Sequence, residues 1–343
     1  MNGLILFAGL IFVLWLGSSI FIPLLIATFV WYLINAIATY YRKLLPRAEN
    51  KKWLAISFNL ISKIFAVATF CGLIYLFITR VHPMFSELLA VMPDIQSSLD
   101  SLWRYISMKI GFNFTLDTLP SINTIVANVG SSVAKIATSM GMILVYILFM
   151  FIEQSTFHKK FAALFPNKNQ NKKMRYILNS IDENMKKYLF MKTLVSGITG
   201  LLSYMWLHVL GLEFAGIWAF GIFLLSYIPT IGAIISCALP IVFSLVTSTT
   251  INQTILISVG LVALQIVFGN ILEPKLTGKT LNLSTLAILI NLVFWGLIWG
   301  VAGMFFSVPL LVATFIITAQ FDSTRWIAVL LSADGKIPDK EED

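Results

Sequence analysis

The residues best suited to chemistry lie in an apolar stretch near the C-terminus, NLVFWGLIWGVAGMFFSVPLLVATF, which covers residues 291–315. It carries Gly296, Gly300, Gly303 and Pro309. These residue types weaken a helix, because glycine loses much conformational freedom on ordering and proline has no backbone N–H. A helix that breaks in an apolar setting exposes N–H and C=O groups that can bind a small polar solute.

The length of this apolar run predicts that it folds back on itself. As one straight helix, residues 283–318 would measure about 54 Å, whereas the hydrocarbon core of a membrane is about 30 Å thick. The same reasoning predicts a second hairpin over residues 214–247, folded at Pro229 and Gly232. Backbone that is broken at membrane depth persists only where protein or a water-filled cavity covers it. The two hairpins therefore indicate a polar pathway inside the protein.

Neutral polar side chains accompany these breaks. Gln265 and Asn270 lie between the two hairpins, and Asn291 lies in the last one. Part of this set has another interpretation, because Gly296 and Gly300 have the GxxxG spacing of packed helices and polar side chains also join helices by hydrogen bonds. The predicted substrate pathway comprises Pro229, Gly232, Gln265, Asn270, Asn291, Gly296, Gly300, Gly303 and Pro309.

A charged boundary separates two apolar runs in the same region. It contains Glu273, Pro274, Lys275 and Gly278. A carboxylate at such a boundary is most often solvated, but ionisable groups inside membrane segments commonly serve function. We predict a coupling or gating role for these four residues.

The composition is that of a membrane protein, and the sequence carries none of the common enzyme motifs. Of the 343 residues, 58% are hydrophobic and 12% are charged, whereas soluble domains are about a quarter charged. The sequence has no GxxxxGK[ST] loop, no HExxH and no Cys/His cluster, so we expect no catalytic residue, no metal and no cofactor. The net charge of +8 is gathered beside apolar runs, which is typical of cytoplasmic membrane loops and not of nucleic-acid binding.

The order of apolar and basic segments predicts an all-α polytopic membrane protein with about eight membrane segments, including re-entrant or broken helical hairpins. Basic loops should face the cytoplasm. Two passes over residues 4–40, turning near Pro23, would place the N-terminus there, and the polar tail places the C-terminus there too. The predicted divisions are residues 1–80 (N-terminal membrane hairpin, basic loop and third span), 81–134 (external amphipathic segment), 135–152 (span), 153–192 (basic cytoplasmic amphipathic helix), 193–320 (transport core) and 321–343 (tail).

Two amphipathic segments lie outside the expected spans. The apolar seam of the external segment favours a helix that packs on its own domain over a contact between subunits, because it is short for a coiled coil. The basic flanks of the internal segment favour a helix in the lipid headgroup plane over one packed on the protein. The external seam consists of Leu88, Met92, Ile95, Leu99, Leu102 and Ile106. The internal stripe consists of Met174, Ile177, Leu178, Ile181, Met185 and Leu189.

Three blocks of the second half resemble a known family. They read LLSYIPTIGAIISCALP (224–240), NILEPKLTGKTLNLSTLAILI (270–290) and WGLIWGVAGMFFSVPLLV (295–312), and they are similar to the signature blocks of the autoinducer-2 exporter family of bacterial permeases. The sequence departs from the family pattern at Thr230, where an aromatic residue is expected, and in the bulky LIW after the first Trp-Gly pair. The resemblance implies an oligomeric permease of the bacterial inner membrane. Some members of the family are associated with export of autoinducer-2, and others with sodium or proton antiport.

The residues and the resemblance together predict a secondary transporter or exporter of a small polar solute such as autoinducer-2. One alternative is a sodium or proton antiporter, for which Glu273 is the protonatable candidate. The other is an oligomeric membrane scaffold that does not transport. The expected partners are the solute, a coupling ion, membrane lipids and further copies of the chain, without nucleic acid.

Overall fold

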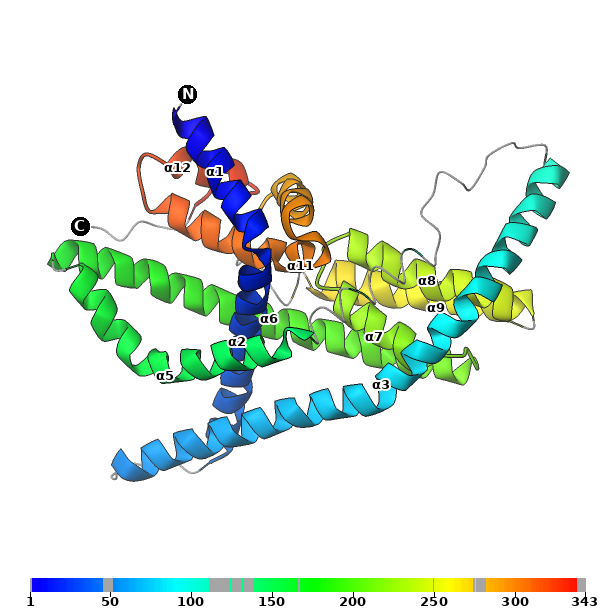
Figure 1. The fold of residues 1–343 in the computed structure, drawn as a ribbon, viewed down its shortest axis with the longest axis horizontal. Coiled ribbons are helices and arrows are strands. Elements are labelled where there is room, and N and C mark those ends of the chain that lie inside the picture. The colour runs from blue at the N-terminus through cyan, green and yellow to red at the C-terminus, as the bar shows by residue number, and fades with distance from the viewer. Residues whose placement is uncertain are drawn as a thin grey trace. The chain divides into compact units, whose positions relative to one another are not determined.

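The part of the chain that the structure describes is built from helices. The computed structural model describes residues 2–45, 52–110, 124, 131, 138–165, 167–248, 250–273, 275 and 282–337. Within these ranges no strand forms beyond an isolated antiparallel bridge between Leu283 and Ser332. The predicted all-α class is therefore confirmed for these residues. The elements are α1 (Asn2–Leu16), α2 (Ser18–Leu44), α3 (Lys52–Ile110), α5 (Met140–Leu164), α6 (Lys168–Val209), α7 (Ala215–Leu225), α8 (Ile231–Thr247), α9 (Ile251–Gln265), the π-helix η2 (Ile266–Leu272), α11 (Thr285–Ala319) and α12 (Arg325–Leu331), as shown in Figure 1.

Several helices have the length and apolar character of membrane spans. Three described helices are both long and apolar enough to cross a bilayer: Ser18–Leu44, Ile251–Leu272 and Thr285–Ala319. Shorter apolar helices cover Leu60–Gly72, Met140–Gln154, Ala215–Leu225 and Ile231–Thr247. These helices are those of a multi-pass membrane protein, and the number of about eight segments stays a prediction.

The N-terminal apolar run does not form the expected hairpin. Only Gly17 separates α1 from α2, and it makes helical hydrogen bonds on both sides, from Gly17 N–H to Val13 O (2.8 Å) and from Phe21 N–H to Gly17 O (2.9 Å). Figure 1 shows α1 leading into α2 without a reversal of direction, and Pro23 lies inside α2. The predicted turn near Pro23 is therefore wrong, and the reason for placing the N-terminus in the cytoplasm is removed with it.

Two long helices run through boundaries that the sequence predicted between segments. α3 continues past residue 80 into the expected external segment, with Pro83 and Pro93 inside it. α6 joins the basic amphipathic segment to the apolar run that follows it. The predicted boundary at residue 192 is therefore not a break in the helix. Residues 168–196 contain no glycine or proline, so nothing in their backbone chemistry stops a helix there.

The chain divides into two compact units. Unit 1 comprises Met1–Phe70, Ile136–Thr193 and Lys275–Asp343, and unit 2 comprises Cys71–Lys135 and Leu194–Pro274. One core of unit 1 includes Ala27 and Ile34 of α2 together with Ile143 of α5.

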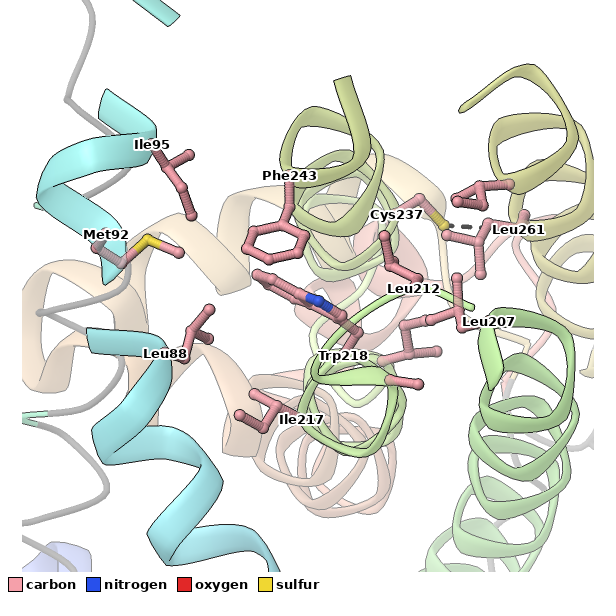
Figure 2. Close-up of a cluster of buried hydrophobic side chains, with 13 residues drawn as sticks. Leu88, Met92, Ile95, Leu207, Leu212, Ile217, Trp218, Cys237, Phe243 and Leu261 are labelled. Atoms are coloured by element: carbon pink, nitrogen blue, oxygen red, sulfur yellow. Dashed lines mark hydrogen bonds between the residues drawn. The ribbon is translucent and has the colours of Figure 1, made fainter. Parts of the chain in front are cut away.

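The apolar core of unit 2 is formed by side chains of α3, α6, α7, α8 and α9. At its centre the rings of Trp218 and Phe243 lie 5.2 Å apart between centroids. Leu88, Met92 and Ile95 of α3 belong to the same cluster and are at most 3% exposed (Figure 2). These three residues of the external seam therefore pack on the chain's own core, and the favoured interpretation is confirmed for them.

The apolar stripe of the basic segment is also covered by protein. Met185 and Leu189 of α6 are 6% and 4% exposed, and they share a core with Val308 and Val312 of α11. Their apolar surface is thus already buried within unit 1. The prediction that this stripe lies among lipid headgroups is therefore wrong for these side chains.

The C-terminal tail is fastened to the start of α11. Ser284 N–H donates to the Leu331 carbonyl at 2.8 Å. The side-chain amide of Asn282 donates to the Asp334 carboxylate at 2.7 Å and to the Lys336 carbonyl at 2.8 Å. We call these contacts the C-terminal clasp. Together with α12 they hold the described part of the tail on unit 1.

Candidate functional site

α11 reverses direction at Gly300. The backbone there has φ +62° and ψ −140°, a conformation that is open to glycine and strained for other residues. A Cβ at this position would meet no described atom within 4 Å, so the backbone conformation and not a lack of space requires glycine. The break divides α11 into a first arm (residues 285–299) and a second arm (residues 301–319), which we call the α11 hairpin.

The two arms lie side by side and antiparallel. Nδ2 of Asn291 donates to the carbonyl of Ser307 at 2.6 Å, although these residues would be about 24 Å apart in a straight helix. A Cβ at Gly296 would lie 2.8 Å from Cε of Met304, so the methionine occupies the space that a side chain would need. Both pairs are nearly symmetric about Gly300, which identifies it as the turn.

The arms approach each other most closely at Gly303. A Cβ here would lie 2.6 Å from the carbonyl carbon of Trp295 and 3.1 Å from Cβ of Trp299, and it would be closer still to the Trp295 carbonyl oxygen. The closest atoms belong to the backbone of the first arm, so no rotation of a side chain can relieve this contact. A different constraint therefore requires glycine at each position. Gly296 leaves room for the Met304 side chain, Gly300 has a positive φ, and Gly303 contacts the backbone of the first arm.

Aromatic side chains surround the turn of the α11 hairpin. Trp299 is 8% exposed, and its indole N–H donates to the carbonyl of Leu14 at 2.9 Å. That carbonyl lies in the last turn of α1, where helical carbonyls lack helical donors. The Trp299 ring is 4.5 Å from the ring of Trp295 and 6.3 Å from that of Phe21, between centroids. The turn is thereby held at the junction of α1 and α2.

Two other predicted pathway residues modify the hydrogen bonding of the α11 hairpin. Pro309 lies inside the second arm and has no N–H to donate to the preceding turn. Asn291 uses its amide to join the arms, as the interhelical hydrogen-bond interpretation expected. All five predicted pathway residues of unit 1 thus belong to one hairpin.

α7 and α8 form a second hairpin, in unit 2, and its turn is strained. The Ile231 N–H donates to the Pro229 carbonyl at 2.5 Å across Thr230. Thr230 has φ +58° and ψ −62°, close to the rare γ-turn that a β-branched residue seldom adopts. A Cβ at Gly232 would lie 2.8 Å from the carbonyl carbon of Leu225, so the chain is tight on both sides of the turn. That either hairpin enters a membrane stays a prediction.

The end of α9 passes into the wider π-helix η2. Glu273 N–H donates to the Phe268 carbonyl, and π-helical turns are frequent at functional sites. Gln265 precedes η2, and its Oε1 is buried without a hydrogen-bond partner among the described residues. A Cβ at Gly269 would lie 2.5 Å from Nε2 of Gln265, so glycine leaves room for this amide. Asn270, one residue further on, is exposed.

Hydrogen bonds between antiparallel helices bring these features of unit 2 to one end of it. Cys237 Sγ of α8 donates to the Leu261 carbonyl of α9 at 3.9 Å (Figure 2), and Thr254 Oγ1 of α9 donates to the Ser244 carbonyl of α8 at 3.1 Å. Continuing the same register along both helices places Gly232 level with the start of η2. The α7–α8 turn and the π-helix therefore share one end of unit 2.

The predicted site residues thus form one set in each unit. Unit 2 holds Pro229, Gly232, Gln265, Asn270 and Glu273, and unit 1 holds those of the α11 hairpin. Of the predicted coupling residues, Glu273 is half-buried at the end of η2 and Lys275 is exposed. Pro274 and Gly278 lie outside the described residues.

The sequence matches a family of membrane transporters over most of its length. The model of that family, described as AI-2E family transporter, covers residues 4–323. The chain belongs to the AI-2E transporter family. The resemblance that the three sequence blocks indicated is thereby confirmed.

Individual relatives of this AI-2E transporter cover the chain almost completely. It is 29% identical over 347 residues to the AI-2 transport protein TqsA of Escherichia coli, and the aligned region covers 97% of this chain and 96% of the relative. It is also 29% identical over 326 residues to a Haemophilus influenzae protein named as a candidate transport protein, covering 92% and 91% of the two chains. Together with the family, these names support a membrane transporter.

Sequence reasoning missed a polar face on α6 of this AI-2E transporter. Ser196, Thr199 and Ser203 are at most 4% exposed although they lie in an apolar part of the helix. Lys192, one turn earlier, is 5% exposed. Spacings of four, three and four residues place all four side chains on one helix face. This polar periodicity inside an apolar run is the signal that would have found them.

Proposed function

We propose that this AI-2E transporter is a secondary exporter of a small polar solute, such as autoinducer-2, across the bacterial inner membrane. The observation that carries the proposal is the reversal of α11 at Gly300 within a 35-residue apolar element. Reversed backbone at membrane depth is stable only beside protein or a polar cavity. Broken helices of this kind bind substrate in secondary transporters. The name of the E. coli relative supports autoinducer-2 as the first solute to test.

In this proposal the turn of the α11 hairpin provides the groups that bind the solute. Backbone N–H and C=O groups near Gly300 lie outside regular helix, so they are the polar groups that an apolar element offers. Gly303 keeps the arms of the α11 hairpin in contact, and the turn is held by Trp299. We further propose a cytoplasmic C-terminus and a homo-oligomeric assembly.

Glu273 is the coupling residue in this proposal. It is half-buried at the end of the π-helix, and a carboxylate beside an irregular membrane helix can exchange a proton or a sodium ion with solution. Coupling through Glu273 would make the exporter an antiporter. Glu273→Gln keeps the shape of the side chain and removes its charge, so it separates transport of the solute from exchange of the ion.

The experiment that tests the proposal is a flux measurement on the purified protein in vesicles. Vesicles are loaded with autoinducer-2, and its efflux is followed with and without sodium and proton gradients. We expect efflux above that of protein-free vesicles, dependence on one of the gradients, and loss of that dependence in Glu273→Gln. Efflux equal to that of protein-free vesicles under every gradient would contradict export of this solute.

A further inference from the structure

The short helix α12 is apolar on two opposite faces. One face packs on α11, where Ala328 is fully buried and shares a core with Ala319. The opposite face, which we call the outer face of α12, consists of Trp326, Val329 and Leu330. These side chains are 63%, 43% and 68% exposed, and spacings of three and four residues place them together on the helix. Large apolar side chains that gather on one exposed face indicate an interaction surface.

α12 lies where both ends of the α11 hairpin meet. Ser284 N–H, at the start of the first arm, donates to the Leu331 carbonyl at the end of α12. Thr324 Oγ1, directly before α12, donates to the Thr318 carbonyl of the second arm at 3.1 Å. A hairpin leaves a membrane on the side at which it entered. With the α11 hairpin in the membrane, α12 is therefore held at that surface of the membrane.

The charges beside the outer face are mostly positive. Arg325 directly precedes Trp326 in α12. Lys173 of α6 places its Nζ over the ring of Phe321, 5.1 Å from the centroid, and Phe321 lies in the connection between α11 and α12. Residues 170–175 and 320–337 together contain five cations and two acids. One of these acids, Asp334, already has a cationic neighbour, because Nζ of Lys336 lies 3.6 Å from its carboxylate.

We propose that α12 lies in the headgroup plane of the membrane, where its outer face inserts among the lipids and Lys173 and Arg325 bind the phosphate of anionic phospholipid. Tryptophan is enriched at membrane interfaces, and cations beside an apolar helix face favour anionic lipid. With the proposed cytoplasmic C-terminus, the surface is that of the leaflet rich in anionic lipid.

Charge favours lipid over a second copy of the chain as the partner of the outer face. A symmetric contact through this face would bring the cations of both copies together, and like charges oppose association. The apolar stripe of α6 is covered by α11, so α12 and not α6 offers an apolar surface to the lipid. The inference requires the α11 hairpin to enter the membrane, but it does not require transport of any solute.

Fluorescence quenching tests where the outer face lies. Leu330→Cys is made in the full-length chain together with Cys71→Ala, which leaves only the buried Cys237 as a native thiol. The new thiol carries a fluorophore, and the protein is placed in lipid nanodiscs, where both membrane faces are open to the solution. One quencher is a phospholipid that is brominated on its acyl chain near the headgroup, and the other is iodide in the water. The control is Gln170→Cys, because Gln170 is an exposed polar residue of α6 in the same unit.

We expect the brominated lipid to quench the label at position 330 at least about twofold more than the label at position 170, because the face of an interfacial helix reaches the acyl boundary. Iodide should show the opposite order. Quenching at position 330 by iodide and not by lipid would place α12 in water and overturn the proposal. Shielding from both quenchers would show that protein covers the outer face, as a second copy would, and would also overturn it.

A lipid titration tests the preference for anionic headgroups. The melting temperature of the purified full-length protein in detergent is followed as phosphatidylglycerol or phosphatidylcholine is added, which gives an apparent affinity for each lipid. Arg325→Gln and Lys173→Gln should each weaken the affinity for phosphatidylglycerol about fivefold. Arg104→Gln, which removes an exposed cation of α3, should leave this affinity unchanged. Equal affinities for the two lipids, or an equal loss in Arg104→Gln, would overturn the anionic site.

The outcome for α12 is separate from the outcome for transport. A label that lipid quenches in a protein without autoinducer-2 efflux contradicts the proposed export alone. Efflux from a protein whose label lipid does not quench contradicts this inference alone.

Discussion

Replacing Gly303 with alanine should force the arms of the α11 hairpin apart. The new Cβ would lie 2.6 Å from the carbonyl carbon of Trp295, whereas ordinary contacts begin at 3.4 Å. The arms must therefore separate by at least about 0.8 Å at this point, since backbone atoms cannot rotate away as a side chain would. The same movement stretches the hydrogen bond between Asn291 and Ser307, now 2.6 Å long, to a length at which it contributes little.

Three contributions set the size of the effect. Overpacking costs about 1–3 kcal/mol and the weakened hydrogen bond about 0.5–1.5 kcal/mol, while alanine in a helix gains about 0.5–1 kcal/mol over glycine. We expect Gly303→Ala to lower the free energy of unfolding by about 1–3 kcal/mol. The distorted hairpin should also lose flux, and Gly303→Leu should abolish flux while the protein still inserts into the membrane.

Matched glycine variants separate the clash from other effects of alanine. A Cβ at Gly141 in α5 meets no described atom within 4 Å, so Gly141→Ala should be neutral or stabilising. Gly300→Ala has the same open space but a positive φ, so it should cost about 1–3 kcal/mol through backbone strain alone. Thermal unfolding in detergent and autoinducer-2 efflux from vesicles measure the two consequences. If Gly303→Ala were as stable and as active as Gly141→Ala, the close contact between the arms would be refuted.

The hydrogen bond from Asn282 holds the pKa of Asp334 below its usual range, so the C-terminal clasp is complete above about pH 4 and is lost as the pH falls further. The protection factors of the tail amides in hydrogen exchange should fall below that pH, and Asp334→Asn should abolish this step. Trp299→Phe removes the donor to the end of α1 and should cost about 0.5–1.5 kcal/mol in thermal unfolding; an unchanged melting temperature would show that this bond is not needed. Thr230→Gly relieves a positive φ and should stabilise the protein by about 1 kcal/mol, so a lower melting temperature would contradict the strain at this turn.

Length and residue type were sufficient to predict both chain reversals. A run as long as residues 283–318 exceeds the thickness of a bilayer, and its glycines lie where a reversal is possible. The same sequence could not distinguish the three glycines from one another. The positive φ of Gly300 and the backbone contact at Gly303 depend on how the two arms meet, which is decided only when they pack.

Other features could not be predicted because local patterns have more than one tertiary solution. Apolar length in the first 40 residues fits two short passes, but α1 leads into α2 across the single residue Gly17 without a reversal of direction. The basic flanks around Met185 resemble those of a helix on a lipid surface, yet α11 supplies an apolar partner within unit 1. The polar spacing that includes Ser196 is visible in the sequence, but its burial depends on neighbouring helices.

The C-terminal clasp has a practical consequence for anyone who modifies this protein. Because Asn282 donates hydrogen bonds to Asp334 and Lys336, the last described residues anchor the start of the α11 hairpin. A fluorescent fusion or purification tag added beyond residue 337 leaves the C-terminal clasp intact. A shortened gene that stops after Leu331 removes both acceptors of the Asn282 amide and leaves only the bond from Ser284 to Leu331 at the start of the first arm.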